Sequence, residues 1–547
     1  MRGTRLIAAT ALCAALAGCA GKAPKKLAEA PPPPPSIAPP PPPAYAPAPA
    51  QAVVVTGSLA RTGPVASEAA YLAPRVMIAP DPGREKYDGK EVSPVKLAQA
   101  EPVSTFSVDV DTGAYANARR FLTQGMLPPP EAVRTEELIN YFRYDYPRPK
   151  DRAQPFTVTT DVAKTPWNAG TYLLRIGLRG YDIDRAERPP ANLVFLIDVS
   201  GSMKSPDKLP LVKTALAGLA DKLGPRDRVA IVVYAGAAGM VLEPTHDTAQ
   251  IRRALESLEA GGSTAGGAGI ELAYRIAEDN FIKGGVNRVI LATDGDFNVG
   301  VSDTKALIAL IEKKRDSGIT LTTLGFGQGN YNEAMMEQIA DHGNGNYAYI
   351  DSALEATKVL GEEMNSTLFT IAKDVKIQIE FNPAVISQYR LVGYENRSLR
   401  EEDFDNDLVD AGDIGAGHQV TAIYEVVPVG GKGWIAPRKY EDAPARAATA
   451  RLAEAATVKL RYKLPESDTS KLIEQVVPSC ALQSAAAPLD DFAFAAAVAA
   501  FGQVLRGDAL MMGFSHADIG LLASKQDNFW RQEFLRLNAL AGSMKGG

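Results

Sequence analysis

Short apolar runs alternate with amphipathic helices between Asn192 and about Met364, and this rhythm constrains the fold more than any other feature of the chain. Between the first two runs, leucine and valine recur at helical spacing from Leu209 to Leu223. Continuous apolar strands that alternate with helices indicate a mostly parallel sheet covered on both faces. We therefore predict a doubly wound α/β domain whose strands are "LVFLID", "RVAIVVYAG", "RVILATD", "ITLTTLGFG" and "NYAYID".

Oxygen-bearing side chains follow the first strand at alternate positions, and two later loops have matching chemistry. In doubly wound sheets, ligands bind at the carboxyl ends of the strands. If the loops are neighbours, two carboxylates and three hydroxyls face one point, and such an all-oxygen set suits Mg²⁺ and can accept Mn²⁺ or Ca²⁺. The alternative is that these residues only cap helices and brace turns. The candidate ligands are Asp198, Ser200 and Ser202, Thr264 in "GGSTAGGAG" and Asp294 in "TDGD".

These motifs resemble the metal-ion-dependent adhesion site (MIDAS) of von Willebrand factor type A (VWA) domains. The D-x-S-x-S motif is matched by Asp198, Ser200 and Ser202, the threonine loop by Thr264 with Ser263 as an alternative registration, and the third motif by Asp294. The resemblance implies a VWA domain with a Rossmann-like sheet. It also implies that the hydroxyls contact the metal directly, that the aspartates often act through water, and that a partner protein supplies a carboxylate to the open position of the ion.

Stretches on both sides of the α/β unit resemble YfbK-type bacterial lipoproteins. They are "TFSVDVDTGAY" and "EELINYF" before it, and "DAGDIGAGH" after it. The resemblance covers the chain from about Tyr87 to its end. It implies a dedicated N-terminal domain, the VWA domain and a C-terminal β-rich and helical domain of unknown function. We expect these domains at 86–190, 191–365 and 366–547.

The first residues have the layout of a secretory signal. Arg2 and Arg5 precede the apolar run "LIAATALCAALAGC", which is too short to span a bilayer comfortably. The end of this run, Leu16 to Cys19, resembles the bacterial lipobox, and the resemblance implies a signal peptide over 1–18 and a lipid on Cys19. The alternative is an ordinary signal peptide with a chance cysteine.

Residues 19–85 are rich in alanine and proline, including "PPPPPSIAPPPPPAYAPAPA". Such a segment cannot bury enough apolar surface to fold, and it serves as a semi-rigid, disordered spacer. A proline-rich partner-binding tract is the alternative. A lipid on Cys19 followed by a spacer predicts a protein of the bacterial cell envelope that is lipid-anchored and faces the periplasm. By analogy with enterobacterial lipoproteins, Ala20 in place of an aspartate favours the outer membrane.

Strands with one apolar face lie on both sides of the α/β unit. Tyr172–Leu178 precedes it, and Val375–Phe381, Val420–Val426 and Val458–Leu464 follow it. Such alternation is typical of half-exposed antiparallel sheet. We predict one antiparallel β-sandwich built from both sides, with the α/β domain inserted between its strands and extra helices in the N- and C-terminal regions. Three domains in series are the alternative.

The chain has a formal charge of -6 and no basic tract, which argues against a nucleic-acid partner. No nucleophile or general base is evident beside the oxygen cluster, so we do not expect an enzyme. We predict a divalent-metal-dependent, protein-binding module of adhesion type. The alternatives are a structural scaffold in envelope assembly that binds without metal and, less favoured, a metal-dependent hydrolase.

Three single residues carry further expectations. Asp111 is expected to cap a helix. Cys480 is expected to be a small buried apolar residue. Asp198 is expected in a solvent-facing loop, so that Asp198→Ala removes metal binding without unfolding the protein.

Overall fold

The computed structural model describes residues 85–545 except 109–110, 151, 263–265, 296–303, 330, 364–365, 367, 410, 437–451 and 512. The predicted signal peptide, Cys19 and all but the last residue of the predicted linker lie outside the described residues, as does Thr264. In the described part, no helix is long and apolar enough to cross a membrane.

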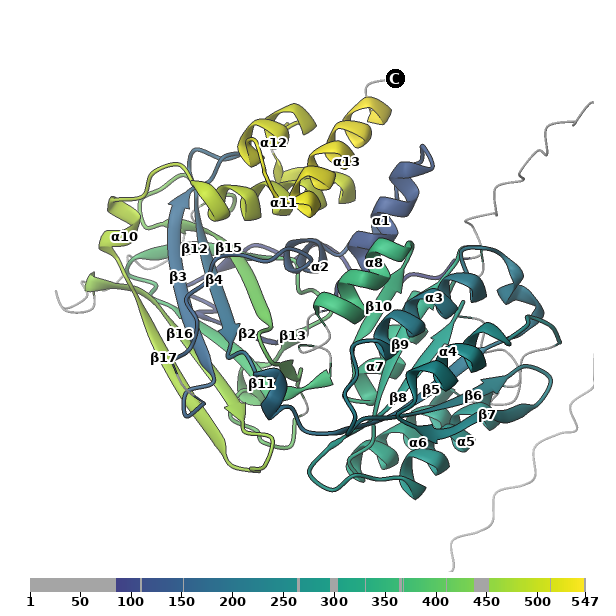
Figure 1. The fold of residues 1–547 in the computed structure, drawn as a ribbon. Helices are drawn as coiled ribbons and strands as arrows, with labels where there is room; N and C mark the ends of the chain where they lie inside the picture. The colour runs from purple at the N-terminus through teal and green to yellow at the C-terminus, as the bar shows by residue number, and fades with distance from the viewer. Residues whose placement is uncertain are drawn as a thin grey trace, which may run out of the picture. The chain divides into compact units, whose positions relative to one another are not determined.

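The α/β domain contains the predicted doubly wound sheet (Figure 1). The strand order is β10-β9-β8-β5-β6-β7, and all neighbours are parallel except β6 and β7. The edge strand β7 was not predicted. The strands are β5 (Ala191–Asp198), β6 (Arg228–Tyr234), β7 (Ala238–Thr245), β8 (Val286–Thr293), β9 (Thr320–Phe326) and β10 (Tyr347–Ile350).

Helices cover both faces of this sheet because its central strands are apolar on both sides. In β5, Phe195 and Ile197 pack with α3, α4 and α8, whereas Val194 and Leu196 pack with α5 and α6. Successive side chains of a strand point to opposite faces, which explains this division. The helices are α3 (Leu209–Ala220), α4 (Thr248–Glu256), α5 (Gly266–Asp279), α6 (Thr304–Asp316), α7 (Glu333–His342) and α8 (Ala353–Thr357).

Two antiparallel sheets form the β-sandwich, with aromatic side chains such as Phe381 and Tyr424 in edge-to-face contact between them. One sheet has the order β1-β12-β15-β4-β3, with β1 (Lys96–Leu97), β12 (Ile386–Val392), β15 (Gln419–Pro428), β4 (Tyr172–Gly180) and β3 (Phe156–Lys164). The other has the order β13-β2-β11-β16-β17, with β13 (Ser398–Leu399), β2 (Val103–Ser107), β11 (Thr370–Phe381), β16 (Glu454–Lys463) and β17 (Ser470–Pro478), and β14 (Ile414–Gly415) also pairs with β11.

The pairing of β4 confirms that the sandwich is built from both sides of the α/β domain. β4 precedes that domain in the chain, yet it pairs with β15, which follows it, in a register from Tyr172–Val426 to Arg179–Gln419. The α/β domain is therefore inserted between strands of one antiparallel structure. The residue boundaries given above for the domains stay predictions.

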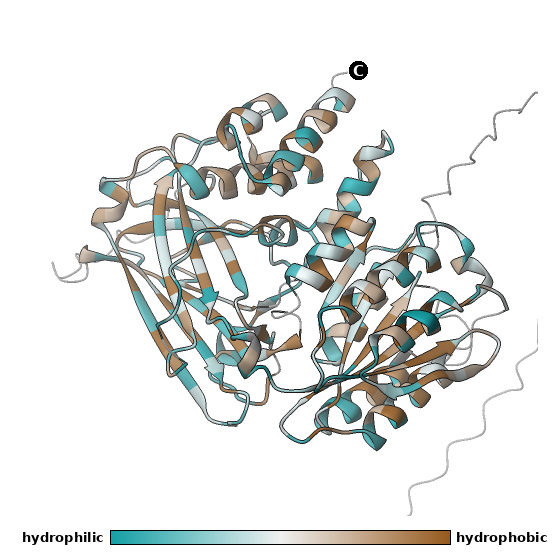
Figure 2. Cartoon of the chain, in the orientation of Figure 1, coloured by the Kyte–Doolittle hydropathy of each residue, from teal (hydrophilic) through white to brown (hydrophobic). Residues whose placement is uncertain are grey.

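The expectation that β4 is half-exposed is wrong. Its inner face contributes Leu174 and Ile176 to the sandwich core, and its outer face is also buried. Arg175 on the outer face binds Asp161 at 2.7 Å and lies 4.7 Å from the ring centroid of Phe492. The strands of the sandwich alternate in hydropathy, whereas the central strands β5 and β6 of the α/β sheet are largely apolar along their length (Figure 2). Helices packed on the outside of β4 bury the face that the sequence had indicated to be exposed.

This outer layer consists of helices from both ends of the described chain, and its core is rich in aromatic edge-to-face contacts such as Phe142 with Phe494. Arg119 joins the layer to the α/β domain, because it donates to Asp351 and Glu355 there and to Glu533 in the last helix. The helices are α1 (Gly113–Thr123), α2 (Thr135–Asn140), α11 (Asp490–Arg506), α12 (His516–Ala523) and α13 (Phe529–Lys545). The short helix α10 (Cys480–Gln483) instead contacts β3 and β17, with Leu482 in the core of the sandwich.

Two expectations about single residues are also wrong. Thr112, not Asp111, is the residue before α1; Asp111 instead accepts the backbone N–H of Tyr347 at 2.8 Å and binds Arg397 at 3.0 Å. Its carboxylate therefore joins α1 to β10 and to the β-sandwich rather than capping a helix. Cys480, expected to be buried, is exposed at the start of α10.

Candidate metal centre

The carboxyl ends of β5 and β8 bring the first and third motifs together. Asp198 is the last residue of β5, and Asp294 directly follows β8. The two strands are parallel neighbours, with Ile197 opposite Ala292. From β5 the chain leads to β6 on one side, and it later returns to β8 on the other side, so the motifs lie where the strand order reverses. Such switch points are where doubly wound sheets bind ligands.

In the second motif, the structure describes Gly261 and Gly262 but not residues 263–265. Gly261 donates its N–H to the carbonyl of Val199 at 2.7 Å, and Gly201 donates to the carbonyl of Gly262 at 3.0 Å. Gly262 has a φ of +89°, a conformation that favours glycine. These bonds hold the loop that leads to Thr264 against the turn after β5. Thr264 itself, and Ser263, lie outside the described residues.

Asp198 is fully buried, contrary to the expectation of a solvent-facing position. Its Oδ1 accepts the N–H of Ser200 at 2.8 Å, and its Oδ2 accepts the hydroxyls of Thr293 at 3.0 Å and Tyr234 at 3.2 Å. Burial raises the pKa of Asp198 to about 6, helped by the nearby Asp294 carboxylate and opposed by the hydrogen bonds from Ser200. Truncation to alanine would leave these donors without their acceptor, so an isosteric asparagine is the better probe of the charge.

The two serines occupy the turn after β5, whose 3₁₀ helix spans Gly201–Lys204. Ser200 is buried and Ser202 is exposed, so the cluster reaches solvent on the side of Ser202. Their hydroxyls share a hydrogen bond, with the Oγ atoms 3.0 Å apart. Neighbouring ligands of an octahedral Mg²⁺ are about 3.0 Å apart, since each lies about 2.1 Å from the ion. The spacing of the hydroxyls and the all-oxygen donor set therefore fit a small hard cation.

Sequence reasoning missed three residues that complete the surroundings of the carboxylates. Thr293 and Tyr234 hold Asp198, and Lys208 donates from Nζ to Oδ2 of Asp294 at 2.8 Å, with 8% of the lysine side chain and 1% of the aspartate side chain exposed. Thr293 could have been found, because it stands beside Asp294 in the third motif. Nothing in the motifs points to Lys208, which precedes α3, or to Tyr234 at the end of β6.

A site here would depend on hydroxyl ligands. Across the described residues, no group of three or more histidine, cysteine, aspartate or glutamate side chains is placed to hold a metal ion. Asp198 and Asp294 supply the negative charge, and Ser200 and Ser202 supply neutral oxygens.

Comparison with known proteins identifies the family. Residues 192–363 match the von Willebrand factor type A domain, 366–544 match the C-terminal region of uncharacterized protein YfbK, and 81–175 match a family described as von Willebrand factor. Uncharacterized protein YfbK of Escherichia coli (strain K12) is 47% identical over 473 residues, which span 84% of this chain and 82% of that protein. The chain belongs to the YfbK family. It carries a VWA domain over residues 192–363.

Another relative and two solved structures match a smaller share of the chain. Uncharacterized protein sll0103 of Synechocystis is 33% identical over 189 residues, which cover 34% of this chain and 43% of that protein. Among solved structures, von Willebrand factor type A from Catenulispora acidiphila is 17% identical, covering 73% of this chain and 91% of its own, with a TM-score of 0.39. Proximal thread matrix protein 1 from the mussel byssus, whose MIDAS motif holds zinc, is 22% identical, covering 34% and 46%, with a TM-score of 0.28.

Proposed function

We propose that this YfbK-family protein is a non-catalytic module of the cell envelope that binds a partner protein through a divalent cation in its VWA domain. The observation that carries the proposal is the arrangement at the ends of β5 and β8. There, Asp198 and Asp294 lie beside two serine hydroxyls at the spacing of metal ligands, and Ser202 is open to solvent.

We assign Mg²⁺ to this site, with Mn²⁺ or Ca²⁺ as substitutes, because every candidate donor is a hard oxygen. Ser200 and Ser202 are the direct ligands, and Thr264 is the third hydroxyl. Asp198 and Asp294 supply the charge. When bound, the cation offers a coordination position that accepts a carboxylate from the partner. The hydrogen bonds from Thr293 and Tyr234 hold the carboxylate of Asp198 in place for this role.

Asp198→Asn tests the metal site. The substitution removes the charge and retains an acceptor oxygen, so we expect Mg²⁺ affinity in calorimetry to fall about 100-fold or more while the melting temperature changes little. Asp221→Asn is the matched control, because Asp221 is an exposed aspartate of the same domain, paired with Arg252. Normal Mg²⁺ binding by Asp198→Asn would refute the metal centre.

Affinity capture from detergent-solubilised envelope tests the partner. We expect a protein that is retained with Mg²⁺, released by EDTA and not retained by Asp198→Asn. A partner retained equally in all three conditions would support the scaffold function instead, and chemical turnover of the partner would support a hydrolase.

The same proposal places the anchor at Cys19, with the alanine- and proline-rich linker between the lipid and the folded part, in the outer membrane. We expect Cys19→Ser to move the protein from the membrane fraction to the soluble fraction. Retention in membranes after a high-salt wash would rule out lipid as the anchor.

A further inference from the structure

Lys208 is held in a fixed position beside the metal centre. It immediately precedes α3, and its ammonium donates to Asp294 at 2.8 Å. Its aliphatic stem lies against Gly327, where a Cβ atom would overlap the lysine Cγ and Cε atoms. Gly327 has a φ of +72°, and its carbonyl accepts the hydroxyl of Tyr349 at 2.6 Å. The backbone at Gly327 therefore supports one side of the lysine stem, whose ammonium bonds the Asp294 carboxylate.

Among the described residues of the centre, the carboxylates of Asp198 and Asp294 and the ammonium of Lys208 carry formal charges that sum to -2 + 1 = -1. A divalent cation brings this sum to +1, whereas without Lys208 the same ion would bring it to zero. The loaded centre thus keeps a positive charge, which the carboxylate of a partner would neutralise.

We propose that Lys208 is a specificity-determining residue that weakens the binding of the cation and strengthens the binding of a carboxylate to the cation-loaded centre. This inference rests on the proposed metal-dependent function. Both effects have one electrostatic cause, because the lysine repels the incoming cation and attracts the incoming anion. The serine ligands are unaffected, so neutralising the lysine changes the charge of the centre without removing a donor to the metal.

Two neutral variants test the first effect. Lys208→Met retains the stem that lies on Gly327, and Lys208→Gln retains in addition a donor to Asp294. We expect both variants to bind Mg²⁺ about tenfold more tightly than the wild type in calorimetry, and Tb³⁺ to gain more than Mg²⁺ because its charge is larger. Lys204→Met is the matched control, because Lys204 is an exposed lysine of the same turn; its Mg²⁺ affinity should stay within about twofold of the wild type.

Acetate titration of the Mn²⁺-loaded proteins tests the second effect. Water-proton relaxation reports the displacement of water from Mn²⁺, and we expect acetate to bind severalfold more weakly in both neutral variants than in the wild type. Unchanged or weaker Mg²⁺ binding by the neutral variants, or unchanged acetate binding, would overturn the inference. If the wild type and all variants bind no metal, the proposed function fails and the inference with it; if the wild type binds metal normally and the neutral variants match it, only the inference fails.

Discussion

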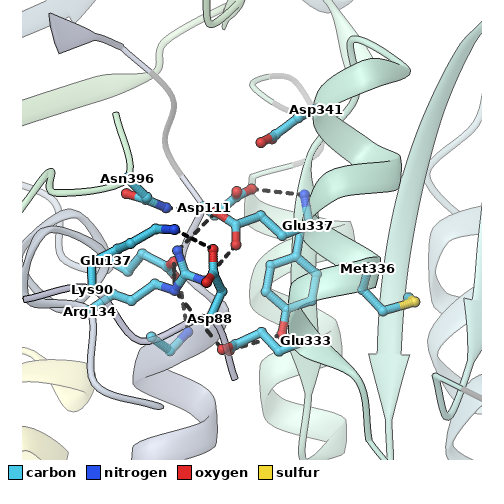
Figure 3. A network of polar contacts seen from close by, with 12 residues as sticks. Asp88, Lys90, Asp111, Arg134, Glu137, Glu333, Met336, Glu337, Asp341 and Asn396 are labelled. Carbon is cyan, nitrogen blue, oxygen red and sulfur yellow. Dashed lines mark hydrogen bonds and ion pairs between the residues drawn. The ribbon is translucent and has the colours of Figure 1, made fainter. Parts of the chain in front are cut away.

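The α/β domain contributes to two buried groups of acidic side chains, and they differ in what surrounds them. At the metal centre, Asp198 and Asp294 are accompanied by neutral hydroxyls and one lysine. In α7, Glu333 and Glu337 belong to a network of carboxylates and guanidinium groups, which we call the α7 network (Figure 3). The network contains Asp111, Arg134, Glu137, Glu333, Glu337, Asp341, Asn396 and Arg397.

The difference shows how each group can compensate its charge. The proposed metal centre is exposed to solvent at Ser202, where a cation from solution would enter. In the α7 network, Arg134 binds Glu337 at 2.6 Å, and burial favours the protonated form of other carboxyl groups such as that of Glu333. Burial raises the pKa of Glu333 to about 7, against the opposing effect of Arg134, and burial also raises the pKa of Glu137 well above its ordinary range. The first group is suited to bind an ion, and the second is suited to join elements of the fold.

Arg397→Met should have the largest effect, on stability. Arg397 binds Asp111 at 3.0 Å, Glu337 at 2.8 Å and Asp341 at 2.6 Å, and only 11% of its side chain is exposed. Removing a buried cation leaves its carboxylates uncompensated, which typically destabilises a protein by about 3 to 5 kcal/mol. We expect a large decrease in the calorimetric melting temperature. The protein that remains folded should bind Mg²⁺ with unchanged affinity.

The matched control is Arg400→Met, three residues along the chain. The side chain of Arg400 is 72% exposed and binds the neighbouring Glu402 and Asp403. Exposed ion pairs contribute little, so the melting temperature should stay close to that of the wild type. Equal effects of the two substitutions would contradict the structural role of the α7 network.

The two groups also differ in how far the sequence predicts them. Asp198, Ser200 and Ser202 lie at alternate positions of one turn, and a strand end that carries such a motif is visible in the chain itself. The partners in the α7 network are remote: Arg134 and Glu337 are 203 positions apart, and Arg397 and Asp111 are 286 apart. Asp111 therefore resembled a helix cap in the sequence.

The same reason explains the errors elsewhere. The inner face of β4 could be predicted from its own alternation, and the apolar strands after the α/β domain indicated where its partner lies. Its outer face could not be predicted, because the cover comes from α11, more than three hundred positions later in the chain. Likewise, Lys208 is 86 positions from Asp294, and only the folded sheet brings the two together.

Glu333→Gln should have an intermediate effect that depends on pH. Glu333 is fully buried in α7, facing Arg134, Glu337, Tyr347 and Arg120. Its pKa is raised from an unfolded value near 4.5 to about 7, so the folded state retains the proton more strongly than the unfolded state. The contribution of Glu333 to stability is present in full below pH 4.5 and is lost as the pH rises through 7.

The glutamine variant lacks this dependence. Relative to the wild type, we expect little change in stability at pH 4.5 and a gain on the order of 3 kcal/mol at pH 8, measured by urea unfolding. Glu256→Gln, on the exposed surface of α4, is the control and should show the same difference from the wild type at both pH values. A constant difference for Glu333→Gln as well would mean that Glu333 is not protonated in the folded state at neutral pH.

The smallest effects are expected from removing one neutral side chain from each group. Ser202→Ala deletes an exposed hydroxyl, so we expect Mg²⁺ affinity to fall about tenfold. The melting temperature should change little, because the buried Ser200 hydroxyl, which bonds that of Ser202, retains its hydrogen bond to Asp198. Asn396→Ala deletes the amide that donates to Glu337 at 2.8 Å, so we expect a loss of about 1 kcal/mol in stability and unchanged Mg²⁺ affinity. Calorimetric titration and thermal unfolding of both variants give four measurements, and the comparison holds only if each variant changes one quantity and not the other. If Ser202→Ala lowers the melting temperature while Mg²⁺ affinity stays constant, the hydroxyls after β5 serve the fold, and the two acidic groups do not differ in kind.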